Sequence, residues 1–149
     1  MDRHGGTASH YVKQRHDRGC AIATIAMVTG TSYHEVLDKA FPSGFRRLRE
    51  PGRAYDIGVT PRKAVQLIQS YGIKARLTLR RRVLKNTSIM FFDWFPDHDQ
   101  VVGYHSVVWL PRHGKILDPG WTKPLEPGFY VDRWIRSGRT AIEMPDRVD

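Results

Sequence analysis

The sequence predicts an α+β fold in which N-terminal helices pack on a mostly antiparallel β-sheet. Two observations support this class. Helix start and stop signals dominate the first half of the chain, whereas alternating or β-favouring apolar runs follow from about residue 73 onward. Helices that precede the strands, rather than alternate with them, are typical of α+β proteins.

The first two helices are predicted from the residues at their ends. The apolar run over residues 20–29 is followed by Gly30, and glycine commonly ends helices because it adopts left-handed backbone angles without strain. Ser32 and Glu35 then have the spacing of a capping box, in which each side chain can bond the backbone N–H of the other. We expect this box to open a second helix that reaches about Ala40.

A third helix is predicted to begin with Thr60 as its N-cap and Pro61 at its first position, and to stop at Gly72. Beyond Gly72 the apolar residues recur at every second position, which is the pattern of a half-buried strand. In this strand the residues expected to face the core are Ile73, Ala75, Leu77 and Leu79.

Four more strands are predicted from apolar, β-favouring runs at residues 88–92, 101–110, 115–117 and 140–144. Residues 111–114, Pro-Arg-His-Gly, have the composition of a hairpin turn, so the strands on either side of them should pair. The aromatic segment 91–96 is expected to be a core strand that leads into a loop, with lining of a substrate groove as the alternative.

We expect residues 1–149 to form a single domain, with residues 1–10 and 145–149 as flexible tails, because apolar residues make up 40% of the chain and are spread along it. A single cysteine cannot form an internal disulfide, so its thiol is available for reaction. The N-terminus has no apolar core of signal-peptide length, and no run reaches a membrane span. The expected location is therefore the cytoplasm, or outside the cell by another export route.

Lysine and arginine exceed aspartate and glutamate by 24 − 15 = 9, and this positive charge favours acidic partners. A nucleic-acid footprint is one interpretation, but no interleaved stacking aromatics accompany the charges, and a solvated basic surface is the favoured one. The basic residues fall in two clusters: Arg46, Arg47, Arg49 and Arg53, then Arg76, Arg80, Arg81, Arg82 and Lys85.

Cys20 is the main candidate for a nucleophile, because it begins a predicted helix whose dipole favours a thiolate. Gln14 and the backbone N–H of Cys20 are candidate donors to an oxyanion. His105 lies near the start of one predicted strand and Asp118 ends the next, so the two can meet at one end of the sheet if the register allows. His113 is the nearest rival histidine, but its place in a turn indicates a solvated residue.

Four short segments contain Gln14, Cys20, His105 and Asp118 in this order. Together they resemble the papain-like cysteine peptidases of the bacterial C39-like type, over roughly residues 10–145. The resemblance implies a papain-like fold and a cysteine peptidase with Cys20 as nucleophile, His105 as general base and acid, Asp118 orienting His105, and Gln14 as oxyanion donor. Ala21 and Ile22 follow the cysteine, where the family often has a small residue and then proline. The family's leader-peptide specificity is not expected, since no transporter segment is present. The resemblance rests on Gln14, Gly19-Cys20-Ala21-Ile22-Ala23, Tyr104-His105-Ser106-Val107-Val108 and Ile116-Leu117-Asp118-Pro119.

Three alternatives remain open. The same residues can carry out deamidation or acyl transfer, as a toxin or effector would, on a protein or peptide substrate that the basic charge suggests is acidic. A basic nucleic-acid-binding module without chemistry is the second alternative. A metal site is the third, although its ligands match no common zinc spacing and no cofactor is expected. The metal-competent residues are His4, His10, His16 and Cys20, or Asp97-His98-Asp99.

Overall fold

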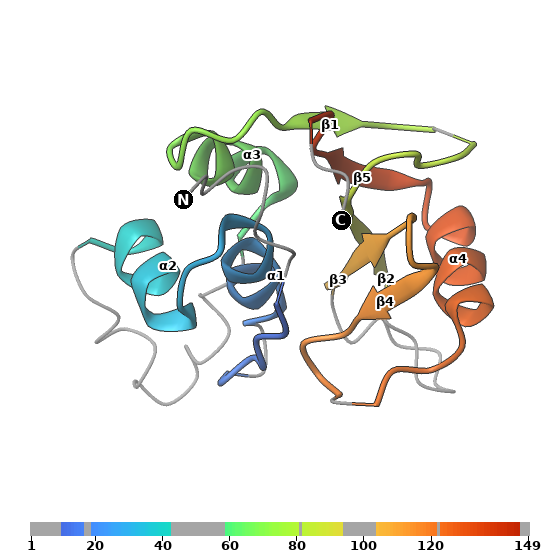
Figure 1. Cartoon of the computed structure of the whole chain (residues 1–149), viewed down its shortest axis with the longest axis horizontal. Coiled ribbons are helices and arrows are strands. Elements are labelled where there is room, and N and C mark those ends of the chain that lie inside the picture. The colour runs from blue at the N-terminus through green and yellow to red at the C-terminus, as the bar shows by residue number, and fades with distance from the viewer. Residues whose placement is uncertain are drawn as a thin grey trace.

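The computed structural model describes residues 10–16, 19–42, 59–80, 82–93, 104–121 and 123–146, and these form an α+β fold (Figure 1). Three helices precede the sheet, and a fourth lies between its last two strands along the chain. The helices are α1 (Cys20–Thr29), α2 (Tyr33–Ala40), α3 (Pro61–Gln69) and α4 (Pro127–Arg136). The strands are β1 (Arg76–Thr78), β2 (Ser88–Asp93), β3 (Tyr104–Leu110), β4 (Lys115–Leu117) and β5 (Thr140–Glu143).

Three of the predicted helix-end signals are confirmed, at Gly30, Ser32 and Thr60, whereas α3 ends at Gln69 with Ser70 as its C-cap, before the predicted stop at Gly72. Gly30 adopts a left-handed conformation with φ of 71° and closes α1 with a bond from its N–H to the Ala26 carbonyl. The Ser32 hydroxyl accepts the Glu35 N–H at 3.1 Å, and the Thr60 hydroxyl accepts the Lys63 N–H at 3.2 Å. These bonds satisfy N–H groups that the helices cannot pair internally.

The sheet is antiparallel throughout its five described strands, in the order β1-β5-β2-β3-β4. The turn at residues 111–114 joins β3 to β4 as predicted, with the His113 N–H bonded to the Leu110 carbonyl at 3.1 Å. His105 is opposite Phe92 on β2, and Val108 is opposite Leu117 on β4. This register directs the end of β4, and Asp118 after it, toward the start of β3.

Helices cover both faces of the sheet: α1, α2 and α3 lie on one side and α4 on the other (Figure 1). The side chains of β2 alternate between two cores, with Ile89 and Phe91 under the first three helices and Met90 and Phe92 under α4. This double covering explains why residues 89–92 are all apolar.

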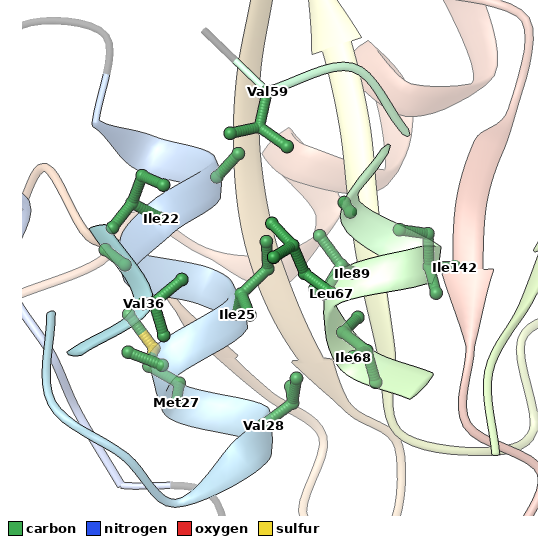
Figure 2. Packing of buried hydrophobic residues seen from close by; sticks show 14 of the residues in the cluster. Ile22, Ile25, Met27, Val28, Val36, Val59, Leu67, Ile68, Ile89 and Ile142 are labelled. Atoms are coloured by element: carbon green, nitrogen blue, oxygen red, sulfur yellow. The ribbon is translucent and has the colours of Figure 1, made fainter. Parts of the chain in front are cut away.

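The larger core surrounds α1, which is buried along almost its whole length because α2, α3 and β3 all contact it. A helix that is apolar on every side belongs in the interior, and the sequence of α1 has no charged residue. Figure 2 shows the side chains that converge on it from α2, α3 and the sheet, which include Val36, Leu67, Ile68, Ile89 and Ile142.

Helix α4 was not predicted from the sequence. Its aromatic and β-branched residues favour strands, and Pro127-Gly128 resembles a turn. Tertiary packing overrides these preferences, because Tyr130 and Trp134, one helical turn apart, are both buried against the sheet. Pro127 occupies the first turn of the helix, where proline is tolerated.

The strand predicted after Gly72 is shorter than expected, and its alternation fails after Ala75. Ile73 and Ala75 are buried as predicted, but Leu77 and Leu79 are exposed by 37% and 62%. Thr78 is buried instead and bonds the Ala141 carbonyl. The apolar pattern misleads here because β1 is a three-residue edge strand, paired only with β5, and the chain leaves the sheet at once.

Several sequence predictions lie outside the described residues: the basic cluster at residues 46–53, Arg81, the strand residues 101–103, the segment 94–96 and the possible ligands His4 and residues 97–99. The expected tails also lie mostly outside them. No helix in the described part of the chain is both long and apolar enough to cross a membrane.

Gly19, which precedes α1, is required by packing rather than by its backbone angles. An added Cβ would overlap the Tyr33 hydroxyl and lie 3.0 Å from Tyr33 Cζ. We therefore expect Gly19→Ala to lower the free energy of unfolding by about 1–3 kcal/mol, as overpacking commonly does. Urea denaturation of the purified variant measures this change.

Gly128→Ala is the matched control, because a Cβ at this position in α4 meets no atom within 4 Å. It should raise the free energy of unfolding by about 0.5–1 kcal/mol, since alanine favours helices. Equal stability of the two variants would contradict the packing role of Gly19.

Candidate functional site

Cys20 is the first residue of α1, and its side chain lies where the helix meets the sheet. The first bond of the helical ladder runs from the Ala23 N–H to the Gly19 carbonyl at 3.0 Å. The N–H groups of the first helical turn, Cys20 included, therefore lie outside that ladder and point toward the helix N-terminus. The residue is buried, with 7% of its surface exposed. This position exposes the thiol to the positive end of the helix dipole.

His105 and Asp118 meet as the sequence predicts. The antiparallel pairing of β3 and β4 directs Asp118, the residue after β4, toward the start of β3, and His105 Nε2 lies 2.8 Å from Asp118 Oδ1. Both side chains are shielded from solvent, at 13% and 0% exposed. An edge-to-face contact with Phe92, at 5.5 Å between ring centroids, covers the imidazole from the neighbouring strand.

The Asp118 carboxylate is completely buried and receives three hydrogen bonds. One comes from His105, one from the Gly120 N–H at 2.9 Å to Oδ1, and one from the Tyr130 hydroxyl at 2.7 Å to Oδ2. Burial alone would raise the pKa of this carboxyl, but the bonds and the His105 charge outweigh burial and lower the pKa. Asp118 is therefore an anion at neutral pH.

Cys20 and His105 are hydrogen-bonded to each other, and their pKa values move in opposite directions. Burial raises the pKa of the thiol, but the bond to His105, the charge of His105 and bonds from Ser106 lower it further than burial raises it. Burial lowers the pKa of His105, but the bonds to Asp118 and Cys20 raise it to about 9. These directions favour a thiolate beside an imidazolium at neutral pH.

Ser106 is a member of the site that the sequence did not single out as one. Adjacent residues of a strand face opposite sides, so Ser106 faces α1 while His105 faces α4. The Ser106 hydroxyl and backbone both bond Cys20, and its Oγ lies 3.3 Å from the Thr24 hydroxyl. Cys20 is thus contacted by two residues that face opposite sides of β3.

Gln14 lies in the same neighbourhood. Its backbone N–H bonds the Pro119 carbonyl at 3.0 Å, which ties the segment before α1 to the turn after β4. A Cβ added to Gly120 would lie 3.3 Å from Asp118 Oδ1, 3.7 Å from His105 Cε1 and 3.9 Å from Gln14 Oε1. All four residues singled out from the sequence therefore converge at one end of the sheet.

The Gln14 amide is oriented by a second layer of contacts. Its Nε2 donates to the His16 carbonyl at 3.0 Å, and the same carbonyl accepts the Gly19 N–H at 2.9 Å. Tyr33 anchors this loop, with its hydroxyl 2.9 Å from His16 Nδ1 and the two rings stacked at 5.7 Å. Burial and the nearby Cys20 raise the pKa of Tyr33 to about 12, so it remains a neutral hydroxyl.

Tyr130 is a second site residue, after Ser106, that sequence reasoning missed, because the helix that carries it was missed. Its hydroxyl donates to Asp118 and accepts the Leu125 N–H at 3.1 Å. The Tyr130-Trp134 spacing, with Pro127 three residues before Tyr130, was the available signal for a helix with its aromatic face buried.

The other candidate residues contribute little to this site. His113 is exposed in the 111–114 turn, away from Cys20 at the opposite end of β3. Among the described residues, no group of three or more His, Cys, Asp or Glu side chains is arranged so that it could hold a metal ion. Of the second basic cluster, Arg76 pairs with Glu143 at 2.9 Å, and Arg80, Arg82 and Lys85 are exposed.

No protein-family profile, curated protein or solved structure matches this chain.

The raised pKa of His105 can be measured directly by NMR. In the wild type its ring protons should titrate with a pKa of about 9, because Asp118 and Cys20 stabilise the imidazolium. In Asp118→Asn the pKa of His105 should fall toward 6.5 or below, since burial then disfavours the charged ring.

A second variant, Tyr130→Phe, should leave His105 charged at neutral pH but raise the pKa of Asp118, because one donor to the carboxylate is lost. A His105 pKa near 6.5 in the wild type would contradict the coupling.

Proposed function

We propose that this protein is a cysteine hydrolase of amide bonds, a peptidase with a papain-like arrangement of its α+β fold. The observation that carries the proposal is the hydrogen-bonded series from Cys20 through His105 to Asp118 at the N-terminus of α1. A nucleophile, a base within hydrogen-bond reach and a third group that orients the base are the requirements for this chemistry. The helix with the cysteine packs on the sheet that holds the other two residues.

The two ring nitrogens of His105 have separate roles in the proposed reaction. Nε2 bonds Asp118, which leaves Nδ1 for the bond with Cys20. Asp118 fixes the ring plane and stabilises the imidazolium, while Nδ1 faces the thiolate and the departing group. Gly120 and Tyr130 hold the carboxylate still, so the ring has one preferred orientation.

The proposed reaction has two stages. The Cys20 thiolate attacks the amide carbonyl, a C–S bond forms, and the oxyanion receives N–H donors from the Cys20 backbone and the Gln14 side chain. An amide carries two N–H groups, so Gln14 can bond His16 with one and the oxyanion with the other. The C–N bond breaks as the His105 imidazolium protonates the amine. Water then attacks the thioester, His105 takes its proton, and the C–S bond breaks to restore the thiolate.

Peptide cleavage and side-chain deamidation use the same bond changes, and their products differ. Cleavage yields two fragments, whereas deamidation keeps the chain intact with a mass gain of about one dalton at each Gln or Asn. Mass spectrometry of candidate protein substrates after incubation with the wild type and Cys20→Ala therefore identifies the reaction.

Alkylation by iodoacetamide tests the nucleophile without a known substrate, and the single cysteine makes Cys20 the only thiol that reacts. Since the thiolate is the reactive form and the pKa of the Cys20 thiol is lowered, the wild type should alkylate faster at pH 7 than an ordinary thiol does. In His105→Ala burial raises the thiol pKa, so the rate at pH 7 should fall by about 10- to 100-fold and recover only at alkaline pH.

His113→Ala is the matched control, because it removes an exposed histidine of the 111–114 turn. It should alkylate at the wild-type rate. Equal alkylation rates in the wild type and His105→Ala at pH 7, after circular dichroism has shown that both are folded, would contradict the proposal.

The role of Gln14 can be separated from activation of the thiol. Alkylation creates no oxyanion, whereas attack on a p-nitrophenyl ester does, so Gln14→Ala should slow ester hydrolysis about 10- to 1,000-fold and leave the iodoacetamide rate unchanged. Stopped-flow measurement of both reactions at pH 7 checks this. Parallel losses in the two rates would assign Gln14 to the structure of the loop instead.

A further inference from the structure

A cleft of about 520 Å³ lies along the segment before α1, and Gln14 is the one proposed catalytic residue in its wall. Its walls come from two segments: the extended chain before α1 and the loop between α1 and α2. A volume of this size accommodates a side chain or a short peptide segment. The lining residues are His10, Tyr11, Val12, Lys13, Gln14, Arg15, Thr31, Ser32 and Tyr33.

Two of its lining residues connect the cleft to the candidate site. Gln14 contributes to the cleft wall, and its Oε1 lies 3.9 Å from the Cβ position of Gly120, next to His105 and Asp118. Tyr33 also lines the cleft, and its hydroxyl packs against Gly19, the residue before Cys20. Gln14 and Tyr33 therefore join the cleft to the candidate site, although Cys20, His105 and Asp118 are not part of the cleft wall.

The charge on the cleft wall is positive. Lys13 and Arg15 are both exposed there, with His10 nearby, and none of the described lining residues is acidic. Glu35 bonds Ser32 through its backbone N–H, but its side chain is not part of the wall. Arginine pairs with a carboxylate through two parallel hydrogen bonds, and lysine adds a point charge. The half-buried Tyr11 and Val12 supply apolar surface for the methylene groups behind such a carboxylate.

We propose that this cleft binds an aspartate or glutamate side chain of the peptide substrate, next to the bond that Cys20 attacks. The inference rests on the proposed function for its biological role, but the binding itself does not require the thiol. Lys13 and Arg15 bind the carboxylate, and Tyr33 and Gln14 join this subsite to the reacting atoms.

Binding can be measured on Cys20→Ala, which removes all thiol chemistry, with three fluorescein-labelled pentapeptides: Glu-Gly-Glu-Gly-Glu and its counterparts with Gln or Lys in place of Glu. The glutamate peptide should bind at least tenfold more tightly than the glutamine peptide by fluorescence anisotropy at low salt. Its affinity should fall as salt rises, because exposed charges are screened. The lysine peptide should not bind.

Lys13→Glu/Arg15→Glu in the Cys20→Ala background should abolish the preference for the glutamate peptide. Lys85→Glu/Lys115→Glu makes the same change in net charge at exposed positions near the opposite end of the sheet, and should retain the preference. If the two double variants lose affinity equally, the attraction is a property of net charge, and the cleft proposal is overturned.

The unlabelled glutamate peptide should also protect Cys20 of the wild type from iodoacetamide, and the glutamine peptide should protect it far less. Tight binding without protection would separate the cleft from the thiol and overturn the placement beside the reacting bond. Rapid alkylation with no preference for the glutamate peptide would overturn this inference and leave the proposed hydrolase intact. Slow alkylation together with binding that depends on Lys13 and Arg15 would overturn the proposed hydrolase and leave the binding of the carboxylate in the cleft intact.

Discussion

A carboxylate removed from water is costly unless several donors replace its hydration, and Asp118 depends on donors from three different parts of the fold. The turn after β4 supplies the Gly120 N–H, β3 supplies His105, and α4 supplies the Tyr130 hydroxyl. The Gly120 bond is local to the turn that holds Asp118, whereas the bonds from His105 and Tyr130 come from other elements. These two bonds tie the edge of the sheet to β3 and α4, so the ionisation of one aspartate depends on how both elements are arranged.

The candidate site consequently spans the molecule from one helical layer to the other. Cys20 belongs to the layer formed by α1, α2 and α3, whereas Tyr130 belongs to the single helix on the opposite face (Figure 1). The start of β3 joins them, because His105 and its neighbour Ser106 face opposite sides of the sheet and both contact the thiol. A small change in how either layer packs would alter the distance between the sulfur and the ring. The tight core around α1 therefore stabilises the site as well as the fold (Figure 2).

Sequence reasoning succeeded where the determining signal is local. Three residues end or begin a helix as predicted, because the cap depends on their own backbone or side chain: Gly30, Ser32 and Thr60. The pairing of β3 with β4 follows from a short turn with suitable residues, and it is enough to bring His105 to Asp118. The site could be anticipated to that extent because its central pair lies within one hairpin.

Sequence reasoning failed where an element depends on contacts with distant parts of the chain. Residues 127–136 carry strand-favouring side chains, and only packing against a sheet formed by distant segments makes them a helix. Leu77 and Leu79 follow an alternating pattern, but the strand that they suggest has a partner on one edge only. Tyr130 could not be assigned to Asp118 without that helix. Such features depend on contacts between segments far apart in the chain, which no single window of residues records.

The order of the elements along the chain also has a consequence for the reactivity of the thiol over time. Cys20 emerges early in synthesis, 85 residues ahead of His105 and still further ahead of Asp118 and Tyr130. Until β3, β4 and α4 have assembled, the cysteine has neither the ring nor the carboxylate that lower its pKa, and it behaves as an ordinary thiol. Completion of the fold therefore sets the time at which the thiol pKa falls, and a nascent or partly unfolded chain carries an ordinary thiol.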